Sequence, residues 1–229
     1  MIDFTWKDVK ASDKGILVTS LSPITKASER IERIVIDGRD GDIAISQGFD
    51  TYNKTIQIGL TKDFDINYLI NWLQGESKII FSDEYQFYYN ARIVNQIDFR
   101  RLLRFKTATI IFQVQPYKFL IEENTIDTTS LTFEVENKGY VESKPIMTIH
   151  GSGEIAVAIN GLQICTLFLD TNDNITIDSI LEEAYQGTTA VLRNRSMNGI
   201  FPTLESGINT ITLTGAVTRT IVIPMSRWL

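Results

Sequence analysis

Two Asp-Gly dipeptides lie close together between apolar runs, and they constrain the fold of the first half of the chain. Asp37-Gly38 and Asp40-Gly41 enclose Arg39, with residues 34–36 before them and residues 43–45 after them, both rich in Ile. Glycine adopts positive φ without a Cβ clash, and Asp tolerates it better than most residues. The pattern therefore predicts a hairpin whose sharply shaped loop presents Arg39 at its tip. We interpret this loop as structural.

One helix is expected in the first half of the chain, over about residues 64–75. Its apolar side chains recur at the spacing of one helical face: Ile66, Leu69, Ile70 and Leu73. Asp63 or Asp65 can cap its start, and Gly75 can end it in a left-handed conformation. Strand patterns surround it at residues 56–60, 78–81, 87–97 and 107–114, the last closing at Pro116.

From residue 131 onward, short apolar runs separated by turn residues continue to the end of the chain. They lie at residues 131–135, 146–149, 155–159, 162–169, 175–177, 190–192, 208–213 and 217–223. This spacing is typical of an all-β sandwich. Residues 122–130 are polar and unpatterned, which indicates a linker between a domain over 1–121 and a domain over 131–229. We expect a mainly β chain, with an α+β domain containing one helix followed by a β-sandwich.

The composition excludes several classes of protein. One cysteine, Cys165, cannot form an internal disulfide, and zinc binding normally needs several Cys and His residues. No apolar run approaches the roughly 18 residues that span a bilayer, so we expect no membrane insertion. The N-terminus has no pattern of a secretory signal. These features are typical of a protein made in a reducing cytoplasm.

The charge is distributed unequally along the chain. Residues 1–120 contain 16 Lys and Arg against 15 Asp and Glu, a net charge of +1. Residues 121–229 contain 6 against 13, a net charge of −7, which brings the whole chain to −6. Because phosphate affinity depends on clustered Lys and Arg, the acidic half is not expected to bind nucleic acid, and we predict no recognition of nucleic-acid sequence.

No catalytic or metal-binding pattern is present. His150 is the only histidine, which excludes any multi-His metal site, and we interpret it as structural or merely exposed. Residues 170–174 imitate the start of a calcium loop, but Ile175 stands where Gly is needed and Leu181 where Glu is needed. We interpret this segment as a polar turn between strands. No cofactor is expected.

The densest basic segment of the chain combines four cations with apolar neighbours. Its cations are Arg100, Arg101, Arg104 and Lys106. Leu102, Leu103 and Phe105 lie among them, which is unusual for a solvated loop. Two interpretations stay open: a projecting hairpin that docks on a partner, or a charged hairpin tip with no special role.

The order of several motifs resembles a known family. In the first half the matching segments are Asp37-Gly38-Arg39-Asp40-Gly41, Asn71-Trp72-Leu73, Phe81-Ser82-Asp83, Tyr88-Tyr89-Asn90-Ala91 and Phe112-Gln113-Val114-Gln115-Pro116-Tyr117. In the second half they are Asn137-Lys138-Gly139, Pro145, Gly151-Ser152-Gly153, Ile159-Asn160-Gly161, Ile177-Asp178-Ser179 and Gly207-Ile208-Asn209-Thr210-Ile211. Together they cover nearly the whole chain. In this order the chain resembles the distal tail protein of long-tailed, non-contractile phages and related prophages.

The resemblance implies a structural protein without enzymatic activity. In this family the N-terminal domain assembles into a hexameric ring around the tail channel, and the C-terminal domain is a galectin-like sandwich. The implied location is the virion tail tip. The implied partners are further copies of the chain, the tail tube protein, a tail-associated tip, lysin or baseplate protein, and a receptor-binding protein.

Two other classes of function are kept beside this one. Galectin-like sandwiches bind sugars on exposed aromatic side chains, so a carbohydrate-binding module that recognises the host surface is the main alternative. The second domain offers Phe133, Tyr140, Phe168, Tyr185, Phe201 and Trp228 for this purpose. A hydrolase of cell-wall sugars is the weaker alternative, because no pair of carboxylates stands out.

Overall fold

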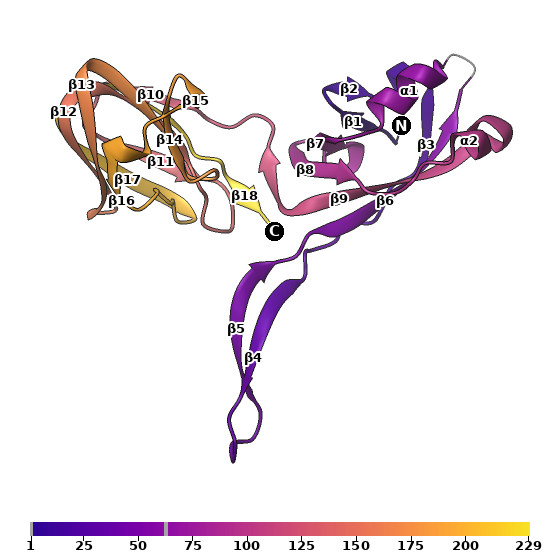
Figure 1. Cartoon of the computed structure of the whole chain (residues 1–229), viewed down its shortest axis with the longest axis horizontal. Helices are drawn as coiled ribbons and strands as arrows, with labels where there is room; N and C mark the ends of the chain where they lie inside the picture. Colours follow the sequence, from indigo (N-terminus) through magenta and orange to yellow (C-terminus); the bar gives the residue numbers. More distant parts are fainter. Residues whose placement is uncertain (1, 62–63) are drawn as a thin grey trace. The chain divides into compact units, whose positions relative to one another are not determined.

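The structure is a computed structural model that describes residues 2–61 and 64–229. Strands dominate it (Figure 1), which confirms the expected mainly β fold class. The chain divides into two compact units: unit 1 is Met1–Ile121 with the terminal Leu229, and unit 2 is Glu122–Trp228. Each unit has its own buried apolar cluster.

Unit 1 is built on an antiparallel sheet with the strand order β2-β1-β7-β8-β9-β6-β3. Its strands are β1 (Phe4–Trp6), β2 (Val9–Lys10), β3 (Ile16–Ser20), β6 (Tyr52–Leu60), β7 (Glu76–Phe81), β8 (Phe87–Ile93) and β9 (Thr107–Leu120). Its helices are α1 (Ile66–Trp72) and α2 (Phe99–Phe105), with short 3-10 turns at Ser12–Lys14 and Ser82–Glu84. A separate two-stranded sheet consists of β4 (Glu29–Val35) and β5 (Asp42–Phe49).

Helix α1 is the helix that the sequence predicts, and it is shorter than the predicted span 64–75. The Asp65 carboxylate caps it by accepting hydrogen bonds from the backbone N–H groups of Asn67 and Tyr68 at 2.9 and 3.3 Å. The other predicted cap, Asp63, lies outside the described residues. Leu69 and Leu73 of the predicted stripe are buried, as is Trp72 beside them, whereas Ile70 is 43% exposed.

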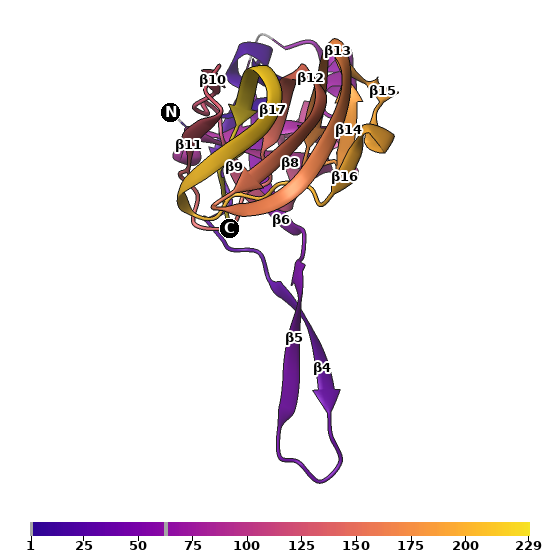
Figure 2. The same ribbon diagram turned by 90° about the vertical axis from the view of Figure 1, so that its left-hand side faces the viewer.

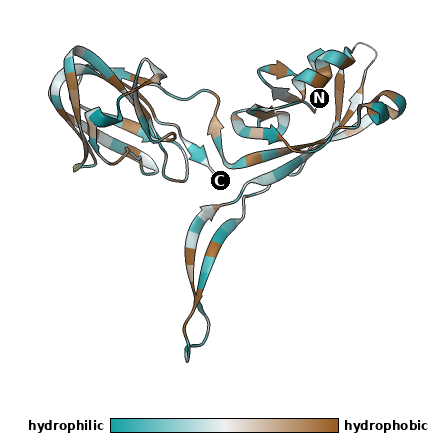
Figure 3. Ribbon diagram, viewed as in Figure 1, coloured by the Kyte–Doolittle hydropathy of each residue, from teal (hydrophilic) through white to brown (hydrophobic). Residues whose placement is uncertain are grey.

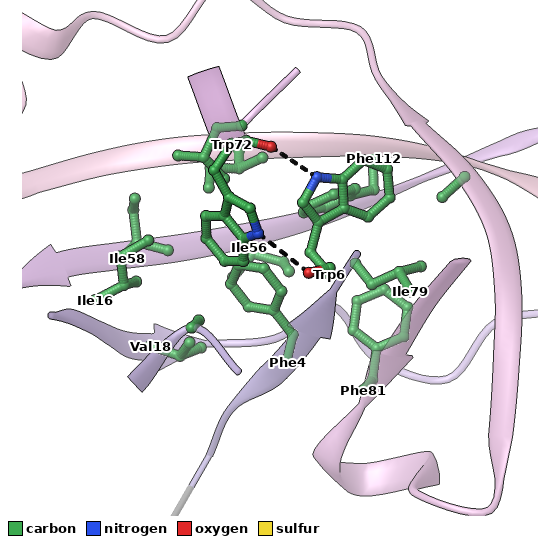
Figure 4. Close-up of a cluster of buried hydrophobic side chains, with 14 of the residues drawn as sticks. Phe4, Trp6, Ile16, Val18, Ile56, Ile58, Trp72, Ile79, Phe81 and Phe112 are labelled. Atoms are coloured by element: carbon green, nitrogen blue, oxygen red, sulfur yellow. Dashed lines mark hydrogen bonds between the residues drawn. The ribbon is translucent and has the colours of Figure 1, made fainter. Parts of the chain in front are cut away.

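Two tryptophans join α1 to the sheet in the centre of unit 1 (Figure 4). The indole Nε1–H of Trp6 donates to the carbonyl oxygen of Trp72 at 2.9 Å, and that of Trp72 donates to the carbonyl oxygen of Trp6 at 3.1 Å. Phe4 stacks on Trp72 with ring centroids 6.0 Å apart, and Phe112 of β9 meets Trp6 edge to face at 5.1 Å. The exchange satisfies both buried indoles, as burial of a polar group requires.

Strand β9 continues through Pro116 to Leu120, although the sequence predicts that it ends at Pro116. The reason is a bulge, since the pairing of β8 with β9 steps from Tyr89–Lys118 to Ala91–Val114. A bulge leaves residues without a ladder partner, so a proline that lacks an N–H is tolerated there.

Unit 2 is a second antiparallel sheet with the strand order β10-β17-β12-β13-β14-β15, in which β11 also pairs with β17 and β16 with β13. Its strands are β10 (Ile126–Thr128), β11 (Thr132–Asn137), β12 (Ile146–Ile159), β13 (Leu162–Asp178), β14 (Glu183–Gln186), β15 (Thr188–Leu192), β16 (Met197–Gly199) and β17 (Gly207–Ile223). The short strand β18 (Arg227–Trp228) is not part of this sheet. A 3-10 turn lies at Asn194–Ser196. The segment 122–130, expected as a linker, includes strand β10, which pairs with β17.

Three long strands replace six of the short strands that the sequence predicts. The runs 146–149 and 155–159 are two halves of β12, and β13 and β17 combine their predicted pairs in the same way. The interruptions are bends in which two backbones come close: a Cβ on Gly151 would lie 2.4 Å from the carbonyl oxygen of Ala216, and one on Gly215 would lie 2.4 Å from that of Glu154. Register shifts mark these places, and bulges of this kind bend a sheet over its own core.

We predict that Trp72→Phe destabilises unit 1. The substitution removes the indole N–H and leaves the buried carbonyl oxygen of Trp6 without its donor, at a cost of about 1–3 kcal/mol. Denaturant unfolding followed by circular dichroism measures the loss. Tyr68→Phe on the exposed side of the same helix is the matched control and should change the unfolding free energy by less than about 0.5 kcal/mol. Equal stabilities for the two variants would contradict the prediction.

Candidate functional site

The β4–β5 hairpin that the sequence predicts is present, and it lies outside both sheets (Figures 1 and 2). All of β4 is exposed, as is β5 up to Gln47. The loop residues Gly38, Arg39, Asp40 and Gly41 follow β4 and precede β5, and all four are exposed. Gly38 and Gly41 have φ of +80° and +81°, the conformation for which glycine was expected.

One face of the hairpin carries an apolar stripe, which we define as Ile34, Ile43 and Ile45. Figure 3 shows brown, apolar segments along both strands of the hairpin. Residues that pair across an antiparallel ladder share a face. Ile34 pairs with Ile43, and Ile45 pairs with Glu32, so the three isoleucines lie together. Their exposures of 40, 36 and 42% are unusual for three neighbouring isoleucines on one small element.

Within the described part of the chain, few contacts other than its own ladder stabilise the hairpin. Arg30 donates to the carbonyl oxygen of Gln47 at 3.0 Å and lies 3.6 Å from the Asp50 carboxylate. Arg33 lies 3.5 Å from Asp42, with both side chains exposed. Exposed ion pairs contribute about 0–1 kcal/mol, and an isolated two-stranded hairpin is marginal in water. The hairpin is therefore an element whose apolar face lacks cover within the described chain.

The basic segment forms a helix, which corrects both the single predicted helix and the predicted hairpin. Helix α2 begins after Asp98, whose carboxylate accepts a hydrogen bond from the backbone N–H of Arg101 at 2.9 Å. Leu102 is fully buried and anchors the helix to the core, and Lys106 ends it in a left-handed conformation with φ of +59°. The sequence signal that could have indicated this helix is Asp98, an N-cap residue that precedes the apolar residues Leu102 and Phe105.

The cations of α2 are not neutralised. No ion pair joins Arg100, Arg101, Arg104 or Lys106 to any residue that the structure describes. Two of them lie over aromatic rings instead: Arg104 is 5.2 Å from the Phe105 centroid, and Lys106 is 4.9 Å from the Phe64 centroid. Such contacts leave the charge available to a partner.

A buried charged cluster, which the sequence did not indicate, lies elsewhere in unit 1. The Glu84 carboxylate accepts hydrogen bonds from Lys54 Nζ at 3.1 Å, from the Tyr89 hydroxyl at 2.7 Å and from Lys118 Nζ. Lys54 is 1% and Glu84 is 7% exposed. Lys54 Nζ also lies 4.8 Å from the ring centroid of Phe81. The cluster ties the turn after β7 to β6 and β9.

Burial alone would raise the pKa of Glu84. Hydrogen bonds from Lys118 and Tyr89 and the charge of Lys54 outweigh it, and they hold the pKa below its usual value. The pKa of Tyr89 is raised, first by burial and then by its hydrogen bond to Glu84. The carboxylate is thus ionised and the phenol protonated at neutral pH, so Glu84 accepts from all three donors.

The other residues considered from the sequence are all part of unit 2 strands. His150 lies inside β12, and residues 170–174, predicted as a turn, lie inside β13. Cys165 is 2% exposed, and burial raises its pKa to about 12. Among the described residues, no group of His, Cys, Asp and Glu is placed to bind a metal ion. Neither described helix could span a membrane.

Comparison with solved structures shows that the chain has the fold of phage distal tail proteins. The Dit protein (gp 19.1) of phage SPP1, described as a paradigm of the hub of the adsorption apparatus in phages that infect Gram-positive bacteria, aligns over 100% of both chains with a TM-score of 0.71 and 16% identity. Chains of the phage p2 baseplate in its activated conformation, solved with Sr and with Ca, align over 97% of this chain and 98% of theirs. Their TM-scores are 0.53 and 0.55, at 10% identity.

No family model and no curated protein sequence matches the chain. The likeness is therefore one of fold, and at that level it confirms the resemblance to distal tail proteins seen in the sequence.

We predict that Glu84→Gln destabilises unit 1 by about 3 kcal/mol at pH 7, because the two lysines lose the buried anion that compensates them. Since the pKa of Glu84 is lowered in the folded state, its contribution is complete above the pKa of a free glutamate, 4.5, and is lost as pH falls through the lowered value. The difference between the wild type and the variant should therefore shrink in acid.

Urea unfolding at a series of pH values measures this difference. Glu76→Gln is the control, because its exposed carboxylate lies 3.8 Å from Arg92 and contributes little. A difference between wild type and Glu84→Gln that stays constant down to pH 2 would show that the carboxylate charge is not what stabilises the cluster.

Proposed function

We propose that the chain is a phage distal tail protein that forms a hexameric ring and joins the tail tube to the baseplate or tail-tip proteins. The observation that carries the proposal is the alignment with the SPP1 Dit protein over the full length of both chains. The number six and the partners come from the family resemblance. In this proposal the protein is structural, without a reaction of its own, and resides at the virion tail tip.

Unit 1 is the proposed ring-forming domain. One face of its sheet is buried on the core, whereas the side chains on the other face are polar: Glu76, Lys78, Asn90, Arg92, Gln113 and Gln115 line a shallow hollow there. Asp8 also lines the hollow, so two acids and two bases balance there, and Arg92 lies 3.8 Å from Glu76. A hydrated face of this kind suits the wall of a water-filled channel.

The hairpin supports assembly more directly. Three exposed isoleucines on a marginally stable two-stranded element indicate that something covers them in the functional state. In a ring, the covering surface is supplied by the neighbouring copy, and a closed ring also covers strand edges. Unit 2, the proposed galectin-like sandwich, has its own buried apolar cluster.

We predict that Ile34→Ser combined with Ile43→Ser weakens the ring, because burying the stripe then removes less apolar surface from water and gains less free energy. Light scattering coupled to size exclusion gives the mass, and negative-stain microscopy shows whether six-fold rings form. Val35→Ser with Ala44→Ser, on the opposite face of the same hairpin, is the matched control.

The outcomes distinguish the existence of the ring from the role of the hairpin in it. A wild-type protein that stays monomeric, even with tail tube and tip proteins present, would argue against the ring itself. A wild-type ring that tolerates the isoleucine changes would argue only against the hairpin as its contact.

Carbohydrate binding by unit 2 is a second proposal, favoured by one observation. Tyr140 is 84% exposed and forms an edge-to-face pair with Trp228 at 6.4 Å. Exposed aromatic faces are where sugar rings stack. We expect Tyr140→Ala to abolish any binding of the whole chain to host cell-wall polysaccharide on a glycan array. Phe168→Ala, which also removes an exposed aromatic side chain, should leave it unchanged. No binding by the wild type would remove this function.

A further inference from the structure

Helix α2 presents a surface that is both basic and apolar. Leu102 is fully buried, and Arg100 and Arg104, one turn apart, point away from the core on the opposite side of the helix. Beside them, Leu103 is 41% and Phe105 is 61% exposed. We define the basic patch as Arg100, Leu103, Arg104 and Phe105.

The basic patch is costly to leave uncovered. Like charges one turn apart destabilise a helix by a few tenths of a kcal/mol, and none of the described acidic residues forms an ion pair with them. An exposed Phe beside two arginines is the composition typical of interface residues. The surface that fits it must therefore be acidic with an apolar residue at its centre.

Unit 2 carries such a surface on an edge strand. Glu134 and Glu136 of β11 are both exposed and lie on the same face, because they are two residues apart on a strand. Glu136 pairs across the ladder with Ile208 of β17, which is 68% exposed. No described cation forms an ion pair with either glutamate, including Lys138 just beyond the strand. We define the acidic face as Glu134, Glu136 and Ile208.

We propose that the basic patch of one copy docks on the acidic face of a second copy, within the ring proposed above. The spacings agree: Arg100 and Arg104 are separated by about 6 Å of helical rise, and Glu134 and Glu136 by about 6.6 Å of strand. Two salt bridges can therefore form side by side, with Phe105 and Leu103 against Ile208.

The choice of a second copy as the occupant follows from charge and symmetry. The two surfaces are opposite in charge and belong to different units of one chain, so their contact is heterologous, the kind of interface that generates closed rings. A patch of this size buries less than the roughly 1,200 Å² of a stable interface. It therefore sets the orientation of neighbours and makes assembly sensitive to salt, while other surfaces supply the remaining area.

The test is a charge exchange in the full chain. Arg100→Glu with Arg104→Glu, and separately Glu134→Arg with Glu136→Arg, should each raise the concentration needed for assembly by at least about tenfold. The four changes combined should restore wild-type assembly. A charge-matched control combines the two arginine changes with Glu122→Arg and Glu154→Arg, exposed acids elsewhere in unit 2, and should not restore it. Sedimentation velocity measures assembly, and circular dichroism checks that each variant is folded.

Each result decides something. Wild-type rings that ignore both pairs of changes would overturn the contact and leave the proposed function standing. Loss of assembly without rescue by the exchange would show that the basic patch binds a different surface, and would also overturn the contact. A wild type that remains monomeric at every concentration would overturn the contact and the self-assembling ring together.

Discussion

Two tryptophans exchange hydrogen bonds at the centre of unit 1, and the elements on its surface depend on that exchange. It fixes α1 on β1, while the edge-to-face contact of Trp6 with Phe112 extends the same core into β9. Strand β9 pairs with β6 over residues 107–114. The hairpin leads into the start of β6, and α2 leads into the start of β9, so both exposed elements are attached to strands that this core holds in register. A change in the tryptophan pair would therefore alter the support of the hairpin and of α2, although neither contains a tryptophan.

The sheet of unit 2 is covered in a different way from that of unit 1, on which helix α1 packs. Its three longest strands bend at bulges and enclose the apolar cluster between their own halves. The bends are possible because Gly151 and Gly215 allow a neighbouring backbone to approach where any Cβ would clash. No helix is needed to cover this sheet, and the outward side chains of its edge strands, such as Glu134 and Glu136, are free to differ in character from the core.

Much of the fold could be predicted from local patterns, and the misses have physical causes. The Asp-Gly dipeptides predict the hairpin correctly, and Asp65 predicts the start of α1, because both signals act over a few residues. In the sequence, the bends of β12 and β17 cannot be told from turns between separate strands, because glycine is typical of both. The capping role of Asp98 was hidden by the charges that follow it. Lys54, Glu84 and Lys118 each look like ordinary solvated charges, and only the tertiary fold brings them together. The hairpin's place outside both cores was also not predicted, because a local turn signal does not indicate which surface covers the strands that it joins.

Among the described residues, β4 and β5 pair only with each other. At the base of the hairpin, Phe49 also meets Tyr117 of β9 edge to face at 6.0 Å. Such an element can open and close without disturbing the core of unit 1, since local opening costs only the contacts that are lost. Whatever surface covers it adds to its stability in proportion to the logarithm of that surface's concentration. The order of the hairpin therefore depends on whether its apolar face is covered, and backbone amide exchange in β4 and β5 is slower in a covered hairpin than in a free one.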